Sequence, residues 1–148
     1  MGLSGGRKPR SKGGEMTSTV VSGQLPFKTL IADDTDVVRE SLRRLLESIG
    51  HTVDVVMDGL EAVEAIRIQP YHLVLLDIQM PRMGGIEVAF HIGGDRLRDQ
   101  APWVVAMSGA SEPEIFDDRL RFDRFLQKPI RLQDLKVLTS EVRTSLRI

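Results

Sequence analysis

The 148-residue sequence contains no cysteine, few aromatic residues and no long apolar run. Without cysteine, a disulfide framework, a thiolate nucleophile and a cysteine-bound metal are all excluded. The longest apolar runs are about five residues, as in 103–107, whereas a membrane span needs about 20. The N-terminus is basic, but no apolar stretch follows it as a secretory signal would require. We therefore expect a soluble, cytoplasmic, single-domain protein with no membrane span.

Charge is unevenly distributed along the chain. Residues 1–24 have a balance of +3 and the whole chain has −1, so residues 25–148 carry −4. Because residues 1–24 are rich in glycine and serine, we predict a disordered tail or linker there and a folded domain over 25–148. The tail's basic cluster could contact nucleic acid or a membrane surface, but four basic residues are too few to favour this: Arg7, Lys8, Arg10 and Lys12.

From residue 27 onward, short apolar runs alternate with helical patterns. We predict strands over 27–32, 53–56, 73–76, 103–107 and 124–127. Helices are predicted after each strand, the second ending at Ile66 and the third extending toward Leu97. Continuous apolar strands separated by helices indicate a parallel sheet covered on both faces. With right-handed crossovers, this is a doubly wound five-stranded α/β domain with helices on both faces.

Two helices show the sequence signature of a capping box. Asp58 precedes Glu61 by three residues at the start of the predicted second helix, and Ser111 precedes Glu114 in the same way at the fourth. In this motif the two side chains satisfy each other's backbone N–H groups. We therefore expect helices to begin at both places.

Polar residues end the predicted strands, at the edge where ligands bind in such sheets. Three acids, one hydroxyl and one amine are expected to meet there: Asp33, Asp34, Asp77, Ser108 and Lys128. Clustered carboxylates repel one another unless a cation lies among them. Since the available ligands are all oxygen, Mg²⁺ fits best, with Asp34 binding it directly and Asp33 partly through water.

This set of residues is suited to phosphoryl transfer. An aspartate can attack phosphorus and form an aspartyl phosphate, and Asp77 ends the central strand of the pattern. The three phosphoryl oxygens then need neutralisation. Mg²⁺ would serve one, Lys128 a second and the Ser108 hydroxyl the third.

The set Asp33-Asp34, Asp77, Ser108 and Lys128-Pro129 resembles the receiver domain of two-component response regulators, with its flavodoxin-like fold. The resemblance covers about residues 26–148 and includes the Met80-Pro81 and Gly84-Gly85 loop. It implies that Asp77 accepts phosphate from a histidine kinase or histidine phosphotransfer protein. It also implies that the Gln79 main-chain carbonyl binds Mg²⁺ and that the Lys128–Pro129 bond is cis.

The resemblance further implies a switch. Phosphate on Asp77 would draw the Ser108 hydroxyl toward it, and Phe125 would rotate into the vacated space. A downstream target would then read the face formed by the fourth helix, the strand over 124–127 and the last helix. Phe125 lacks the tyrosine hydroxyl often found there, residues 119–124 lack the usual glycine turn, and Gln79 and Ala110 stand where the family tunes the lifetime of the phosphate.

Plainer interpretations exist for individual residues. Asp33 and Asp34 could cap the first helix, Ser108 could form a turn, and Phe125 could be ordinary core. Trp103, Met80, Met83 and Met107 are interpreted as packing residues. The scattered histidines show no ligand spacing and are assigned surface or capping roles: His51, His72 and His91.

Three functional alternatives remain at this point. The first is a receiver, either a stand-alone regulator or part of a hybrid kinase, with no DNA-binding domain in this chain. The second is a Mg²⁺-dependent phosphatase or phosphotransferase with an aspartyl nucleophile. Such enzymes usually place a second acid two residues after the nucleophile, where this chain has Gln79. The third is a degenerate receiver that only binds a partner.

Overall fold

The computed structural model describes residues 26–94, 102–109 and 122–148. Within these residues, strands and helices follow one another in the order β2 (Phe27–Ala32), α1 (Asp36–Ser48), β3 (His51–Val56), α2 (Gly59–Ile68), β4 (Leu73–Asp77), α3 (Gly85–Gly94), β5 (Trp103–Ser108), β6 (Arg124–Gln127) and α4 (Leu132–Leu146). All five predicted strands are present. The predicted tail over 1–24, Leu97 and the Ser111–Glu114 capping box lie outside the described residues.

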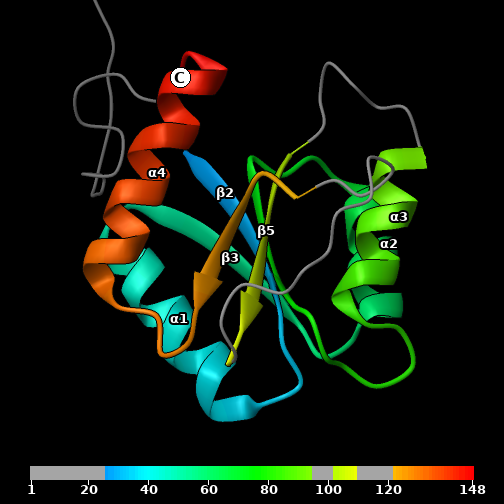
Figure 1. The fold of residues 1–148 in the computed structure, drawn as a ribbon. Helices are drawn as coiled ribbons and strands as arrows, with labels where there is room; N and C mark the ends of the chain where they lie inside the picture. The colour runs from blue at the N-terminus through cyan, green and yellow to red at the C-terminus, as the bar shows by residue number, and fades with distance from the viewer. Residues whose placement is uncertain (1–25, 95–101, 110–121) are drawn as a thin grey trace, which may run out of the picture.

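The five strands form one parallel sheet in the order β3-β2-β4-β5-β6. After β3 the chain crosses back over β2, so later strands are added on the other side. The sheet therefore reverses its direction of growth between β2 and β4, where ligands bind in open α/β sheets. Both strands end at the edge where α1 begins, at the bottom of Figure 1. This confirms the predicted doubly wound fold.

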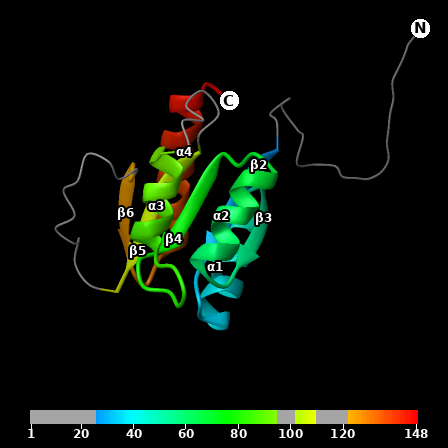
Figure 2. The same cartoon turned by 90° about the vertical axis from the view of Figure 1, so that its right-hand side faces the viewer.

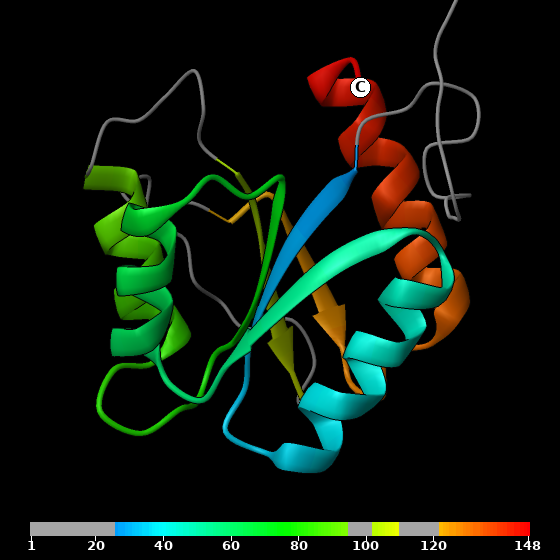
Figure 3. The ribbon, with the colours of Figure 1, turned by 180° about the vertical axis from the view of Figure 1, so that it is seen from behind.

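Helices cover both faces of the sheet, because the strand residues alternate between two apolar cores. Ile31 and Leu75 pack with α1 and α4, whereas Leu30 and Leu76 pack with α2 and α3. All four side chains are fully buried. Figures 1 and 3 show the α1–α4 layer and the α2–α3 layer on opposite sides of the sheet, and Figure 2 looks onto α2 and α3. The central strands β2 and β4 thus each contribute to both cores, which fixes their register.

The start of α2 confirms half of the predicted capping box. Asp58 is the N-cap, and its Oδ1 accepts a hydrogen bond from the Glu61 N–H at 2.9 Å. The reciprocal bond is different, because the Glu61 carboxylate accepts from the Met57 N–H rather than from Asp58. The Glu61 side chain therefore reaches one residue further back than the motif predicts.

The predicted packing residues lie in or against the cores, but one histidine assignment was wrong. Met107 is fully buried, while Trp103, Met80 and Met83 pack partly buried against the cores. His51 was expected at the surface or at a cap, yet it is only 5% exposed. It begins β3 two residues earlier than the predicted strand, because it pairs with Phe27 and its ring stacks on the Phe27 ring.

None of the helices in the described segments combines the length and the apolar character that crossing a membrane requires.

Candidate functional site

The acidic residues predicted at the strand ends lie together. Asp33 follows β2 and Asp77 ends the neighbouring strand β4, so the sheet itself brings them side by side. Asp33, Asp34 and Asp77 each offer a carboxylate oxygen, and these oxygens all lie within 4.8 Å of one another. Asp33 and Asp77 are buried, whereas Asp34 is exposed at the mouth of the site.

Lys128, which follows the edge strand β6, reaches across to these acidic residues. Its Nζ lies 2.7 Å from Asp33 Oδ2 and 3.4 Å from Asp77 Oδ2. The Lys128 main-chain N–H donates to the Ser108 carbonyl at 2.8 Å, which extends the β5–β6 pairing past the strand end. One ammonium group therefore bridges two carboxylates that stand 95 and 51 residues before it in the sequence.

Backbone groups orient both buried carboxylates. Asp33 Oδ1 accepts from the Thr35 N–H at 2.9 Å, and Asp77 Oδ1 accepts from the Gln79 N–H at 3.2 Å. The N-cap of α1 is Thr35. The alternative in which Asp33 or Asp34 caps this helix is therefore wrong, and the Oδ2 atoms of Asp33 and Asp77 are turned toward Lys128.

The electrostatics of the site follow from this packing. Burial, and next the negative charge of Asp33, raise the pKa of Asp77 above its ordinary value. Burial alone would lower the pKa of Lys128, but its hydrogen bond to Asp33 and the charges of Asp33 and Asp77 outweigh this, so the pKa is raised. Lys128 is thus a firmly held cation. It balances only part of the negative charge, because three acids surround one amine.

The donor set fits a hard divalent cation. Carboxylate oxygens are the ligands that Mg²⁺ prefers, and Mg²⁺ binds proteins through one or two carboxylates while keeping water on its other positions. Asp34 is open to solvent and Asp77 carries the raised pKa of a crowded carboxylate. A cation bound by these carboxylates would offset the part of this shift that comes from the charge of Asp33, which is second to the part that comes from burial.

The loop after Asp77 is pressed against the strand end. The Gly85 N–H donates to the Ile78 carbonyl at 3.0 Å, and a Cβ on Gly85 would lie 2.5 Å from the Asp77 carbonyl oxygen. A larger residue would push α3 away from β4. Glycine at positions 84 and 85 therefore allows α3 to begin against the main chain at the end of β4.

The remaining predicted residues are placed as follows. Ser108 is the half-buried last residue of β5. Phe125 is half-buried in β6, with its ring centroid 5.4 Å from that of Phe122. Gln79 is exposed beside Asp77. The Lys128–Pro129 peptide bond is cis, as predicted. The roles of Ser108 and Phe125 in a switch, and of the Gln79 carbonyl as a metal ligand, stay predictions.

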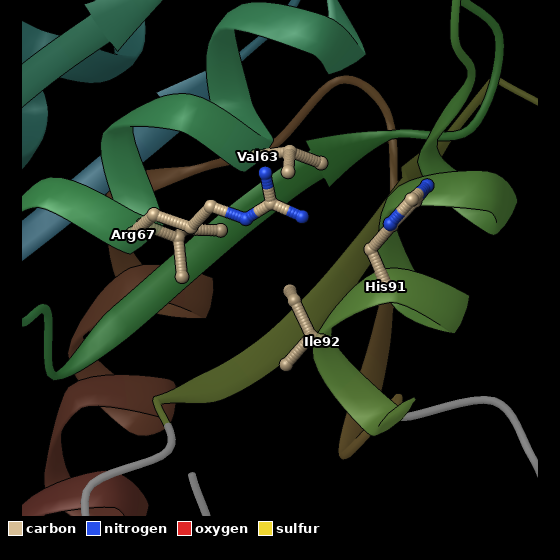
Figure 4. Close-up of a pocket in the computed structure, with 5 residues that line it drawn as sticks. Val63, Arg67, His91 and Ile92 are labelled. Atoms are coloured by element: carbon tan, nitrogen blue, oxygen red, sulfur yellow. The ribbon is translucent and has the colours of Figure 1, made fainter. Parts of the chain in front are cut away.

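The described residues line a hollow beside the site and another away from it. One of about 340 Å³ adjoins the site, and it is lined by α1 and by the segment after β6: Val37, Val38, Ser41, Leu42, Lys128, Pro129 and Ile130. A smaller one lies between α2 and α3, where Arg67 and His91 face each other across Val63 and Ile92 (Figure 4). Only the first shares a residue with the acidic site.

Comparison with known proteins finds a family model, response regulators and a histidine kinase that resemble this chain. A family model for the response regulator receiver domain matches residues 29–140. Response regulator MprA from Mycobacterium sp. (strain KMS) is 35% identical over 75% of this chain and 48% of its own length. The peroxide stress-activated histidine kinase mak1 of Schizosaccharomyces pombe is 35% identical over 78% of this chain and 8% of its own length. The chain thus spans about half, or much less, of these curated relatives.

A solved structure extends the likeness to the fold. Response regulator TrrA from Thermotoga maritima, in complex with Mg²⁺ and BeF, superposes with a TM-score of 0.70. It is 27% identical, and the match covers 78% of this chain and 98% of that one. The five-stranded order, the acidic group at the strand ends and the family match agree: the chain belongs to the response regulator receiver domain family.

Proposed function

We propose that this receiver domain accepts a phosphoryl group on Asp77 from a histidine kinase or a histidine phosphotransfer protein, in the cytoplasm. The observation that carries the proposal is the Lys128 ammonium 3.4 Å from a buried Asp77 carboxylate oxygen, within a group of three acids. An aspartate in that setting has both the nucleophilic oxygen and the adjacent positive charge that phosphoryl transfer uses.

The chemical step is an in-line displacement. An Asp77 carboxylate oxygen attacks phosphorus, and the bond between phosphorus and the donor imidazole nitrogen breaks, leaving its electron pair on that nitrogen. Lys128 is placed to neutralise one phosphoryl oxygen, and the Ser108 hydroxyl is assigned to another. Mg²⁺, when bound, would neutralise charge on the phosphoryl oxygens. Asp33, Asp34, Asp77 and the Gln79 carbonyl would hold it.

The domain would act as a signalling module rather than as an enzyme, because it promotes only its own phosphorylation and dephosphorylation. Ser108 and Phe125 would transmit the change to the face that contains β6 and α4, where a downstream protein reads it. The likeness to TrrA, solved with Mg²⁺ and BeF, supports the cation and the site of phosphorylation. The likeness to a histidine kinase and a response regulator supports the class of partner.

Incubation with acetyl phosphate and Mg²⁺ tests the proposal. The native chain should gain one phosphoryl group, measured by intact mass, while Asp77→Asn should gain none because its amide is no nucleophile. Omission of Mg²⁺ should abolish the reaction of the native chain. Equal modification of both chains would refute the assignment of Asp77, and repeated turnover of a phosphate monoester would favour the phosphatase alternative.

A further inference from the structure

The loop that follows Asp77, residues 78–84, is tied to the start of α2 by an ion pair. Arg82 Nε donates to Asp58 Oδ2 at 2.8 Å, and its Nη2 contacts the same oxygen. Asp58 is buried while Arg82 is half exposed. Arg82 has a φ of 64°, in the left-handed region, which a non-glycine residue adopts only when its surroundings hold it there. This pair is not part of the phosphorylation site itself.

The two carboxylate oxygens of Asp58 bind different partners. Its Oδ1 accepts from the Glu61 N–H and caps α2, and its Oδ2 receives Arg82. Next to it, Gly59 lies so close to the Met83 carbonyl that no Cβ fits between them. The loop is therefore held against α2 by one charged contact and one steric contact, side by side.

The other end of this loop lies at the phosphorylation site. The Gln79 N–H donates to Asp77 Oδ1 at 3.2 Å, and the Gly85 N–H closes the loop on the Ile78 carbonyl. Between these anchors, Arg82 is the one charged residue of 78–84, and among the described residues its ion-pair partner is Asp58. Release of Arg82 would free the middle of a short loop whose first residues orient the Asp77 carboxylate.

We propose that Arg82 is a positioning residue: its ion pair with Asp58 holds the 78–84 loop in the geometry that binds the divalent cation and shields phosphorylated Asp77 from water. This rests on the proposed function. Without the pair, the loop would have to be ordered when the cation binds, which weakens binding. It would also open more often, which exposes the phosphoryl group to hydrolysis. Since the pair is partly exposed, each effect should be about threefold.

Three variants in the full chain test this. Arg82→Met removes the charge, Arg82→Lys keeps it, and Asp58→Asn removes the partner charge while leaving an oxygen to cap α2. Arg44→Met is the matched control, since Arg44 forms an exposed ion pair with Glu40 elsewhere, on α1. Mg²⁺ affinity is measured without phosphate, from the amide resonance of Gln79 during titration. The half-life of the aspartyl phosphate is measured separately.

Arg82→Met and Asp58→Asn should each weaken Mg²⁺ binding and shorten the half-life about threefold. Combining Arg82→Met with Asp58→Asn should have no larger effect than either substitution alone, because both remove the same ion pair. Arg82→Lys should lose less than Arg82→Met, and Arg44→Met should match the native chain. The proposal would be overturned if Arg82→Met had the Mg²⁺ affinity and phosphate half-life of the native chain. This holds even if Asp58→Asn changed both, because that change would then come from the loss of the helix cap. Failure of the native chain to be phosphorylated would refute the proposed function, whereas the Mg²⁺ titration would still decide the role of Arg82.

Discussion

The two ends of the sheet bury polar groups in opposite ways. At the amino ends of the strands, His51 lies between Thr29 Oγ1 at 2.8 Å and Thr139 Oγ1 at 3.0 Å. The Thr139 hydroxyl donates to the Leu135 carbonyl, so it accepts from the His51 Nε2–H and leaves Nδ1 to accept from Thr29. At the carboxyl ends, Asp33 and Asp77 lie buried with a single ammonium between them.

This difference separates stability from function. Every polar atom of the His51 ring has a partner and the ring is neutral, so the amino end joins β2, β3 and α4 without electrostatic cost. The carboxyl end keeps unbalanced negative charge that raises the pKa of Asp77. Substitution of His51 should therefore lower the stability of the folded chain, whereas neutralisation of Asp77 should raise it.

The largest effect is expected for His51→Ala. It would leave a cavity beside Phe27 and deprive two buried hydroxyls of a partner. We expect a loss of about 4 kcal/mol in the free energy of unfolding, from cavity and unsatisfied groups together. Urea denaturation followed by the fluorescence of Trp103 measures it. A loss no larger than that of an exposed control, His91→Ala, would break the contrast between the two ends.

The next effect is on the pH dependence of stability. Burial, and then the positive charges of Arg143 and His72, lower the pKa of His51 to about 4. Between this value and the ordinary 6.5, the unfolded chain binds the proton and the folded chain does not. The free energy of unfolding should therefore fall as the pH drops from about 6.5 to about 4, by up to about 3 kcal/mol from this residue.

Urea denaturation across that range measures the slope, and His51→Gln isolates the contribution of His51 because glutamine does not titrate. The variant should be less stable at pH 7 but should lose less stability on acidification than the native chain. Parallel curves for the two chains would show that folding leaves the pKa of His51 unchanged, which would contradict this prediction.

The smallest effect has the opposite sign. Asp77→Asn removes a charge that burial and Asp33 disfavour, so the folded state should gain about 1 kcal/mol at neutral pH and no Mg²⁺. The sign follows from the raised pKa, since a carboxyl that resists ionisation in the folded state costs stability once ionised. Thermal unfolding measures this. Added Mg²⁺ should then stabilise the native chain more than the variant, and destabilisation by Asp77→Asn would contradict the charge imbalance.

Local patterns in the sequence were sufficient to predict that the five strands exist and that three charged residues meet at one edge of the sheet. Each strand is a run of apolar residues ended by a polar one, and parallel strands end at one edge, so Asp33, Asp77 and Lys128 could be placed together before any coordinates. The exact extent of β3 was missed because His51 is polar. The ion pair of Arg82 with Asp58 was also missed, because its two residues lie on different elements and the local pattern around Asp58 predicts only a helix cap.

The sequence by itself determined the order of the elements, the parallel sheet and the residues at its carboxyl edge, because these depend on periodicity and on where each apolar run stops. Only the tertiary structure decided which residues of different elements form ion pairs or hydrogen bonds with one another. The Lys128 ammonium between two acids, the neutral His51 ring between two threonines and the hold of Arg82 on α2 depend on side-chain packing across elements. Composition and residue spacing do not give the distances between side chains on different elements.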